Sequence, residues 1–369
     1  MKGGALYRKY RPKTLEDVLG EEHITQTLKN AAISDKISHA YLFYGSRGTG
    51  KTTIARILAK ILNCETRQKD KKFSATGEPC NKCLACTEID LGRSLDVVEI
   101  DAASNRGIDE IRDLKDSIKL SPSSLKYKIF IIDEVHQLTK EAFNALLKTL
   151  EEPPAHAVFI LATTEYEKVP STIISRTQRF NFRKIPIVNI IEKLKIISKE
   201  EKISIEDEAL ELIAESAEGG LRDAESILDQ IRSFDKKITV SEVENMLGKA
   251  GFKKIFHFAE LLTKKDTKGS LEFINAIYNE GFSIVDVTKE LIHFLRKTLS
   301  LKADPNFEKI FEKELTQSEI TKLKELAKIA DEKLLISLIR GLIKAYSEMR
   351  YSPFSYIPLE VAVVEILKN

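Results

Sequence analysis

Short apolar runs alternate with longer stretches of helical periodicity over roughly the first half of the chain. Several runs are rich in β-branched or aromatic residues and lack polar alternation, as expected of strands buried on both faces. Helical stretches of roughly ten or more residues separate the runs, which is typical of a parallel α/β sheet with crossover helices. The expected strands are His39–Tyr44, Leu95–Ile100, Lys128–Ile132, Val158–Ala162 and Gln178–Phe182.

The strand signals end at Pro186, and the remainder of the chain has helical patterns. Ile187–Leu247 is typical of several short helices, with Gly219–Gly220 and Asp235 as breaks. Lys249–Asn369 is a second helical block in which apolar residues recur at three-to-four spacing. We therefore expect three parts, namely an α/β core over 1–182, a small helical lid over 183–247 and a helical C-terminal domain over 248–369.

The composition is that of an ordinary soluble protein, with 43% hydrophobic and 31% charged residues. The formal net charge is only +2, so any contact with nucleic acid has to come from local basic patches such as Tyr7–Lys13 and Arg176–Lys184. The sequence has neither the pattern of a secretory signal peptide nor an apolar stretch of the ~18–20 residues that a membrane span needs. These features predict a cytoplasmic protein without membrane contact, in which cysteines bind metal rather than form disulfides.

The segment after the first expected strand matches the phosphate-loop pattern G-x-x-x-x-G-K-[ST] in full. Its glycines let the backbone wrap around phosphate oxygens, and the helix that follows adds partial positive charge. Lys51 is expected to contact the β- and γ-phosphates, and the Thr52 hydroxyl to bind Mg²⁺. A chance glycine-rich turn is the alternative, but the flanking strand and helix favour a nucleotide site. The expected nucleotide-binding residues are Gly45, Ser46, Arg47, Gly48, Thr49, Gly50, Lys51 and Thr52.

Two carboxylates, Asp133 and Glu134, follow the apolar strand Lys128–Ile132. The carboxyl end of a parallel strand is the usual ligand edge of such a sheet, so both should lie beside the phosphate loop. Asp133 is expected to hold Mg²⁺, and Glu134 to polarise the attacking water. The alternative is a pair of carboxylates at a helix N-terminus. The letters DEVH also occur in helicases, but residues 187–369 contain no second parallel-strand pattern.

All four cysteines fall within residues 64–86, as Cys64, Cys80, Cys83 and Cys86. A C-x₂-C-x₂-C run with one more cysteine upstream can supply four thiolates to a tetrahedral Zn²⁺. The polar, lysine-rich segment before Cys80 has little core of its own, so a metal would contribute directly to its folding. An iron–sulfur cluster is the alternative for four thiolates.

The order and spacing of these pieces, with others along the chain, resemble the gamma/tau ATPase subunits of the bacterial DNA polymerase III clamp loader. The resemblance covers essentially the whole chain and implies an ATP hydrolase of the AAA+ type, using ATP, Mg²⁺ and Zn²⁺, with no polymerase active site of its own. The matching segments are LYRKYRPKTLEDVLG, the phosphate loop, the four-cysteine insert, EIDAASNRGIDEIRDL, DEVHQLTKEAFNALLKTLEEPP, LATTEYEKVPSTIISRTQRF and GGLRDAESILDQ.

This resemblance implies roles that spacing alone does not. Thr164 matches the family's sensor-1 position, and Arg176 matches its arginine finger, which reaches the ATP of the neighbouring subunit. Arg222 matches the sensor-2 arginine on the lid helix, and Tyr10–Gly20 matches the region around the adenine. From the residues alone, each arginine could equally form a surface ion pair. One departure is Glu21, where the family often has glutamine.

The resemblance also implies an assembly. The 248–369 block matches an oligomerisation collar, and the expected partners are clamp-loader subunits of the delta and delta-prime type, the sliding clamp, the DNA polymerase III holoenzyme and primer–template DNA. A clamp has to be loaded at any sequence, so we expect DNA contacts to the phosphate backbone. Candidates are Arg106, Arg112 and Lys119, for which a solvated helix face is the alternative.

Overall fold

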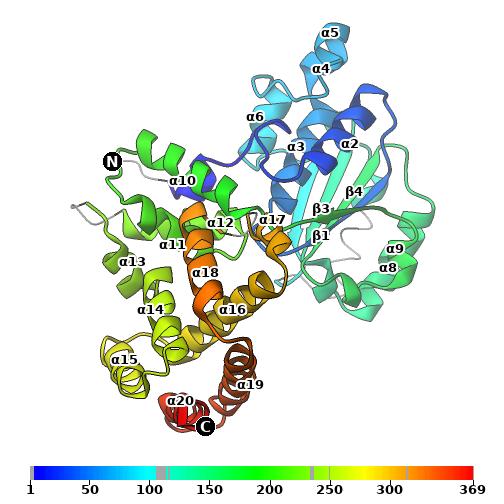
Figure 1. Cartoon of the computed structure of the whole chain (residues 1–369). Coiled ribbons are helices and arrows are strands. Elements are labelled where there is room, and N and C mark those ends of the chain that lie inside the picture. The colour runs from blue at the N-terminus through cyan, green and yellow to red at the C-terminus, as the bar shows by residue number, and fades with distance from the viewer. Residues whose placement is uncertain are drawn as a thin grey trace. The chain divides into compact units, whose positions relative to one another are not determined.

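A computed structural model describes residues 4–104, 114, 117–232, 237–248, 250–312 and 315–368 (Figure 1). The chain divides into two compact units. The first comprises Met1–Ile185 together with Ala217–Ser226, and the second comprises Pro186–Ser216 together with Ile227–Asn369. The chain therefore returns to the first unit for a short segment, and this segment includes Arg222.

The first unit is built on a five-stranded parallel sheet with the strand order β2-β3-β4-β1-β5. Strands β3 and β4 are buried almost along their whole length, which explains their uninterrupted apolar sequences. Because all strands run in one direction, their carboxyl ends meet at one edge, where β1, β3 and β4 lead into the candidate site. The strands are β1 Ala40–Gly45, β2 Val97–Asp101, β3 Lys128–Asp133, β4 Ala157–Thr163 and β5 Gln178–Phe182.

Helices cover both faces of this sheet (Figure 1). Successive strand side chains point to opposite faces, and here both sets are apolar. Phe43 belongs to the core on the side of α2 (Glu22–Ile33) and α3 (Lys51–Asn63). Its neighbour Leu42 belongs to the core on the side of α8 (Lys140–Glu151). The remaining short helices of this unit are α1 Leu6–Lys9, α4 Glu65–Lys69, α5 Lys71–Ser74, α6 Leu84–Asp90, η1 Val135–Gln137, η2 Tyr166–Lys168 and α9 Ser171–Ile174.

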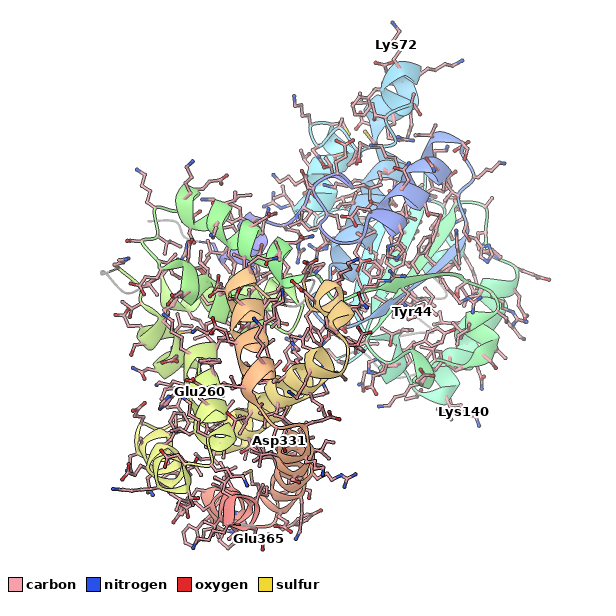
Figure 2. The ribbon with its side chains drawn as sticks, viewed as in Figure 1. Tyr44, Lys72, Lys140, Glu260, Asp331 and Glu365 are labelled. Atoms are coloured by element: carbon pink, nitrogen blue, oxygen red, sulfur yellow. The ribbon has the colours of Figure 1, made fainter. Side chains whose placement is uncertain are left out.

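An insert that carries the four cysteines follows α3. Its helices α4, α5 and α6 are short, and the exposed side chain of Lys72 on α5 points away from the ribbon (Figure 2). Arg67 on α4 donates hydrogen bonds to the carbonyl oxygens of Ala32 and Ser74 and so ties the insert to α2.

The second unit is helical in its described part, apart from an isolated bridge between Ile205 and Ile238. Helices α10, α11 and α13 pack together, and α16 packs against α14, α18 and α19 in a separate apolar core. Helix α12 (Leu221–Ile231) begins in the first unit and ends in the second. The other bounds are α10 Ile187–Glu200, α11 Asp207–Ser216, α13 Val240–Leu247, α14 Phe252–Thr263, α15 Thr267–Asn279, α16 Ile284–Ala303, η3 Pro305–Phe307, α17 Glu308–Phe311, α18 Gln317–Ile329, α19 Glu332–Glu348 and α20 Tyr356–Lys368.

The predicted fold class, a parallel α/β core followed by helical parts, is confirmed. All five predicted strands are present, and their ends differ from the predicted ones by at most two residues. The largest difference is at β2, where Leu95 lies outside the strand and is 81% exposed. Burial raises the pKa of the next residue, Asp96, but the hydrogen bonds that its carboxylate accepts have the larger effect and lower this pKa below its usual value. The donors are the backbone N–H groups of Ser123, Ser124 and Leu125. Asp96 therefore fixes the turn that leads into β3.

Candidate nucleotide-binding site

The phosphate loop links the end of β1 to the start of α3. Gly45 has a φ of +141°, and a Cβ at this position would overlap the carbonyl oxygen of Phe182 on β5. Only glycine therefore lets the chain leave the sheet here. The turn is braced by the Thr49 hydroxyl, which donates to the carbonyl oxygen of Ser46 at 2.9 Å. Arg47 also lines the pocket that the loop borders.

Lys51 is held inside this loop. Its side chain is buried, and its ammonium group donates to the carbonyl oxygens of Gly45 at 2.9 Å and Ser46 at 2.8 Å. Burial lowers the pKa of Lys51, and the nearby carboxylates of Glu134 and Asp133 partly counteract this. A phosphate group has the charge and the acceptor oxygens to replace the two carbonyl contacts.

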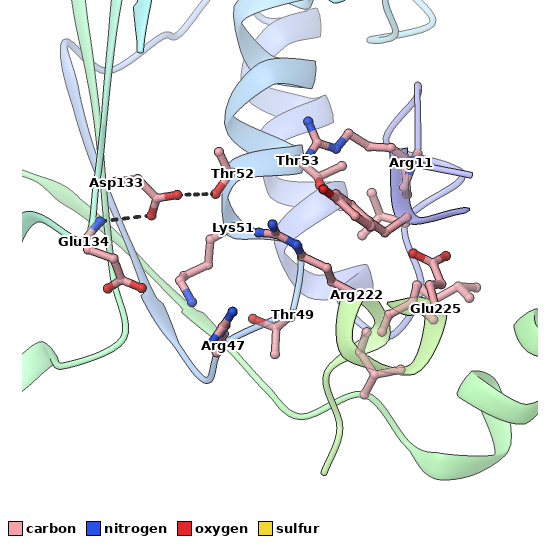
Figure 3. Close-up of a pocket in the computed structure, with 18 residues that line it drawn as sticks. Arg11, Arg47, Thr49, Lys51, Thr52, Thr53, Asp133, Glu134, Arg222 and Glu225 are labelled. Carbon is pink, nitrogen blue, oxygen red and sulfur yellow. Dashed lines mark hydrogen bonds between the residues drawn. The ribbon is translucent and has the colours of Figure 1, made fainter. Parts of the chain in front are cut away.

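The end of β3 brings a carboxylate to the start of α3. The Thr52 hydroxyl donates to Asp133 Oδ2 at 2.7 Å, although the two residues are 81 positions apart (Figure 3). The other oxygen, Oδ1, accepts the N–H of Glu134 at 3.0 Å. A hydroxyl and a carboxylate oxygen at this separation are the hard oxygen donors that Mg²⁺ prefers, so these two residues fit the expected magnesium site.

Glu134 leaves the strand in the left-handed backbone region, with a φ of +48°. Its Oε2 accepts both the backbone N–H of Thr164 at 3.1 Å and its hydroxyl at 2.9 Å. The side chain of His136 is 4% exposed, and its Nδ1 lies 3.3 Å from the same Oε2 and 2.9 Å from the Thr163 hydroxyl. The ends of β3 and β4 thus hold Glu134 and Thr164 together. No role was predicted for His136 from the sequence.

The N-terminal segment and the first turn of α12 complete the pocket (Figure 3). Gly48 approaches Gly220 closely, since a Cβ on Gly48 would lie 3.0 Å from the Gly220 Cα. This contact brings Arg222 to the pocket, where its guanidinium lies 4.8 Å from the ring centroid of Tyr7. Arg11 also lines the pocket, and burial, together with the charge of a neighbouring arginine, lowers its pKa.

Glu225 is a pocket residue that the sequence did not single out. It is 4% exposed and lies one helical turn after Arg222. The only sequence signal available was its i, i+3 spacing from Arg222, and this spacing is common on any helix.

Arg176 does not line this pocket. Its guanidinium donates to Glu151 Oε1 at 2.6 Å and to the carbonyl oxygen of Thr172 at 2.8 Å. The arrangement is the surface ion pair that the residues alone left open, and it is equally compatible with a role outside this chain's own site.

The four cysteine Sγ atoms lie within 4.8 Å of one another. Cys64 and Cys86 are buried, and burial raises the pKa of both thiols. Burial acts the same way on Cys80, but hydrogen bonds from Thr66 and from backbone N–H groups outweigh it and lower its pKa to about 6. Four convergent sulfur donors fit a structural Zn²⁺ site.

Two of the three candidate DNA contacts, Arg106 and Arg112, lie outside the described residues, and Lys119 is exposed. Among the described residues, no helix has both the length and the apolar character that crossing a bilayer requires.

Comparisons with known proteins match the chain along its length. Sequence models described as DNA polymerase III, delta subunit, as clamp loader subunit, ATPase lid domain, and as subunits gamma and tau domain III match residues 20–186, 189–233 and 238–368. The gamma subunit of Buchnera aphidicola from Acyrthosiphon pisum is 35% identical over 98% of both chains. The chain belongs to the gamma/tau family of DNA polymerase III. The tau subunit of Bacillus subtilis is 45% identical over 99% of this gamma/tau chain, which spans 63% of that relative's length.

Among solved structures, the RuvB Holliday junction branch migration motor of Thermotoga maritima matches 69% of this gamma/tau chain and 79% of its own, with 19% identity and a TM-score of 0.46. Family membership makes the chain a DNA polymerase III clamp-loader subunit, and the model that matches residues 189–233 describes this part as an ATPase lid domain.

Proposed function

We propose that this chain is the ATP-hydrolysing motor subunit of the clamp loader, which opens the sliding clamp and loads it onto primed DNA. The observation that carries the proposal is the convergence of Lys51, Thr52, Asp133 and Glu134 on one pocket of the first unit, with Arg222 at its border. These residues come from three distant segments, and together they offer the charges and oxygen donors that a magnesium nucleotide needs.

The phosphate loop, residues 45–52, binds the triphosphate in this proposal. The ammonium group of Lys51 exchanges the carbonyl oxygens of Gly45 and Ser46 for β- and γ-phosphate oxygens. Thr52 and Asp133 hold Mg²⁺, which neutralises charge on the phosphates when it is bound. The 2.7 Å contact between their oxygens supports this assignment.

Glu134 orients and polarises the attacking water, and Thr164 senses the γ-phosphate. Both donors of Thr164 bind the Glu134 carboxylate, so two hydrogen bonds link the two residues. Arrival of a γ-phosphate near Thr164 would compete for those donors and release Glu134 toward the water. The fixed left-handed backbone at Glu134 keeps its side chain within reach of both positions.

Arg222 acts on the phosphates of its own site, and Arg176 acts in trans on the site of a neighbouring subunit. The stacking contact of Arg222 on Tyr7 leaves its guanidinium at the pocket border. Arg176 lies outside its own pocket, as a residue that serves another subunit must. A guanidinium supplied from outside makes hydrolysis depend on assembly.

The three parts expected from the sequence take separate roles in this proposal. Residues 1–182 are the ATPase core, 183–247 the lid with sensor 2 and 248–369 the collar that binds partner subunits. Residues 64–86 are a zinc module with a structural role, since four protein thiolates leave no open coordination position. The partners are delta- and delta-prime-type subunits, the sliding clamp, the polymerase III holoenzyme and the backbone of primer–template DNA, in the cytoplasm and at the replisome.

ATPase rates test the proposal, measured for the chain alone and then with partner subunits, clamp and primed DNA. Lys51→Ala should abolish ATP binding, and Glu134→Gln should bind ATP without turnover. Arg176→Ala should lower the rate of the assembly on the order of 10³-fold while ATP binding is retained. Full turnover by Glu134→Gln would refute the role of Glu134, and full turnover by the Arg176→Ala assembly would refute the motor cycle.

A further inference from the structure

Helix α12 carries a buried carboxylate on the same face as Arg222. Leu221 and Glu225 are four residues apart and Arg222 and Glu225 three apart, spacings that place side chains on one helix face. All three line the pocket of the first unit, and Glu225 is 4% exposed. A carboxylate is seldom buried unless it has a task or a partner.

Glu225 lies at the opposite end of the pocket from the carboxylates at β3. Figure 3 shows Asp133 and Glu134 on one side of Lys51 and Glu225 on the other, with Arg222 in between. A triphosphate bound by the loop and by Mg²⁺ occupies the end near Asp133. The nucleoside therefore extends toward Glu225.

The apolar residues near Glu225 in the pocket indicate which part of a nucleotide this end binds. Pro12, Val18, Leu19 and Ile185 contribute apolar surface suited to the faces of a purine ring. Apolar contact cannot choose among nucleosides of similar shape, whereas a carboxylate accepts hydrogen bonds and donates none. Glu225 is thus suited to a nucleoside that presents a donor.

We propose that Glu225 is a specificity-determining residue that accepts a hydrogen bond from a donor of the nucleoside, either the amino group of adenine or a ribose hydroxyl. This inference rests on the proposed function. The two oxygens of a carboxylate offer about four lone-pair sites, so contacts that Glu225 makes within the protein leave capacity for a ligand. A hydrogen bond to a charged group in a buried site is stronger than one between neutral groups.

Equilibrium binding to nucleotide analogues tests the inference. Dissociation constants of the magnesium complexes of ATP, purine riboside triphosphate, 2′-deoxy-ATP and 3′-deoxy-ATP are measured by calorimetry for the full chain and for Glu225→Leu. Purine riboside triphosphate lacks only the amino group, and each deoxy analogue lacks one hydroxyl. Glu225→Gln is a second variant in case the leucine variant does not fold, and Glu200→Gln, a change at an exposed carboxylate on α10, is the matched control.

The wild type should bind one analogue at least about tenfold more weakly than ATP, which identifies the donor. Glu225→Leu should bind that analogue and ATP alike, with the other ratios unchanged, Glu225→Gln should reduce the discrimination, and Glu200→Gln should keep it. A purely structural role of Glu225 would change all affinities by one factor and leave every ratio as in the wild type, which would overturn the inference. A wild type that binds ATP without discriminating against any analogue would also overturn it. A wild type that binds no ATP would overturn the proposed function as well.

Discussion

Glu21 gives the sharpest prediction about stability. Its side chain is fully buried between the start of α2 and the end of β5, where Oε1 accepts the N–H of Arg183 at 2.7 Å. Oε2 is buried and has no hydrogen-bond partner among the described residues, with His23 Nδ1 3.8 Å away. Burial raises the pKa of this carboxyl from 4.5 to about 7, and the Arg183 hydrogen bond only partly counteracts it. The prediction concerns Glu21→Gln, which replaces the buried carboxyl with an uncharged amide of similar size.

The sign of the effect follows from the two protonation states. Below about pH 4.5 the carboxyl is protonated in both the folded and the unfolded chain, so it contributes no pH dependence. As the pH rises from 4.5 to 7, the unfolded chain ionises while the folded chain keeps its proton, and the wild type loses stability. The difference between about 7 and 4.5, at about 1.4 kcal/mol per pH unit, corresponds to a loss of about 3 kcal/mol above pH 7. The Glu21→Gln variant does not lose this free energy of unfolding, because its amide does not ionise.

We therefore expect the stability of Glu21→Gln relative to the wild type to rise by up to about 3 kcal/mol between pH 5 and pH 8. The chain has two compact units, which can unfold in separate steps, so one global unfolding curve is not sufficient. Urea unfolding is best combined with hydrogen exchange of peptides that cover 20–24 and 178–185, corrected for the intrinsic rate at each pH. Glu141→Gln, at an exposed position on α8, is the control and should show no pH-dependent difference. A stability difference for Glu21→Gln that stays constant from pH 5 to pH 8 would refute the reasoning.

The other predictions concern the candidate sites. Glu151→Gln removes the ion pair of Arg176 and so frees this arginine for the neighbouring site. Because such exposed pairs contribute about 1 kcal/mol or less, the ATPase rate of the assembled complex should rise no more than about fivefold. A large loss of activity would show instead that the ion pair positions the arginine. Asp133→Asn should raise the Mg²⁺ concentration needed for half-maximal ATP binding by at least about tenfold, measured by magnesium titration; an unchanged midpoint would remove Asp133 from the metal site. Cys86→Ser should lower the zinc content, measured by mass spectrometry, and increase hydrogen exchange over residues 64–90, while exchange in β3 stays unchanged. Full zinc occupancy in this variant would contradict the four-thiolate site.

Local pattern was enough to predict the parts of this chain that depend on neighbouring residues. The strands were predictable because apolar β-branched runs flanked by helices leave few other folds. The contact between Thr52 and Asp133 follows from the same logic. Once both residues are placed at carboxyl ends or helix starts of a parallel sheet, the topology brings them together, whatever their distance in sequence.

Single polar side chains whose environment is set by distant packing were not predictable. Glu21 is an ordinary carboxylate in the sequence, and only the contact with Arg183, 162 residues later, makes it a buried one. Glu225 likewise depends on the close approach of Gly48 and Gly220, which brings the start of α12 to the phosphate loop. No periodicity or motif encodes such approaches, because they arise from backbone contacts between segments far apart in the chain.

Each of the two arginines that we propose to act on phosphates makes a weak side-chain contact, which a phosphate group can replace at a small cost in free energy. Arg222 stacks on the ring of Tyr7, and Arg176 pairs with Glu151, whose side chain is 47% exposed. Because both contacts are exposed to solvent, each contributes about 0.5–1 kcal/mol. A hydrogen bond to a charged group that is shielded from solvent contributes about 1.5–3 kcal/mol. A triphosphate can therefore draw Arg222 away, and a neighbouring site can draw Arg176, without any loss in the apolar cores. A ligand shifts an equilibrium only by its differential affinity for the two states. In the proposed function, this difference in free energy therefore sets how strongly ATP favours the assembled, active conformation.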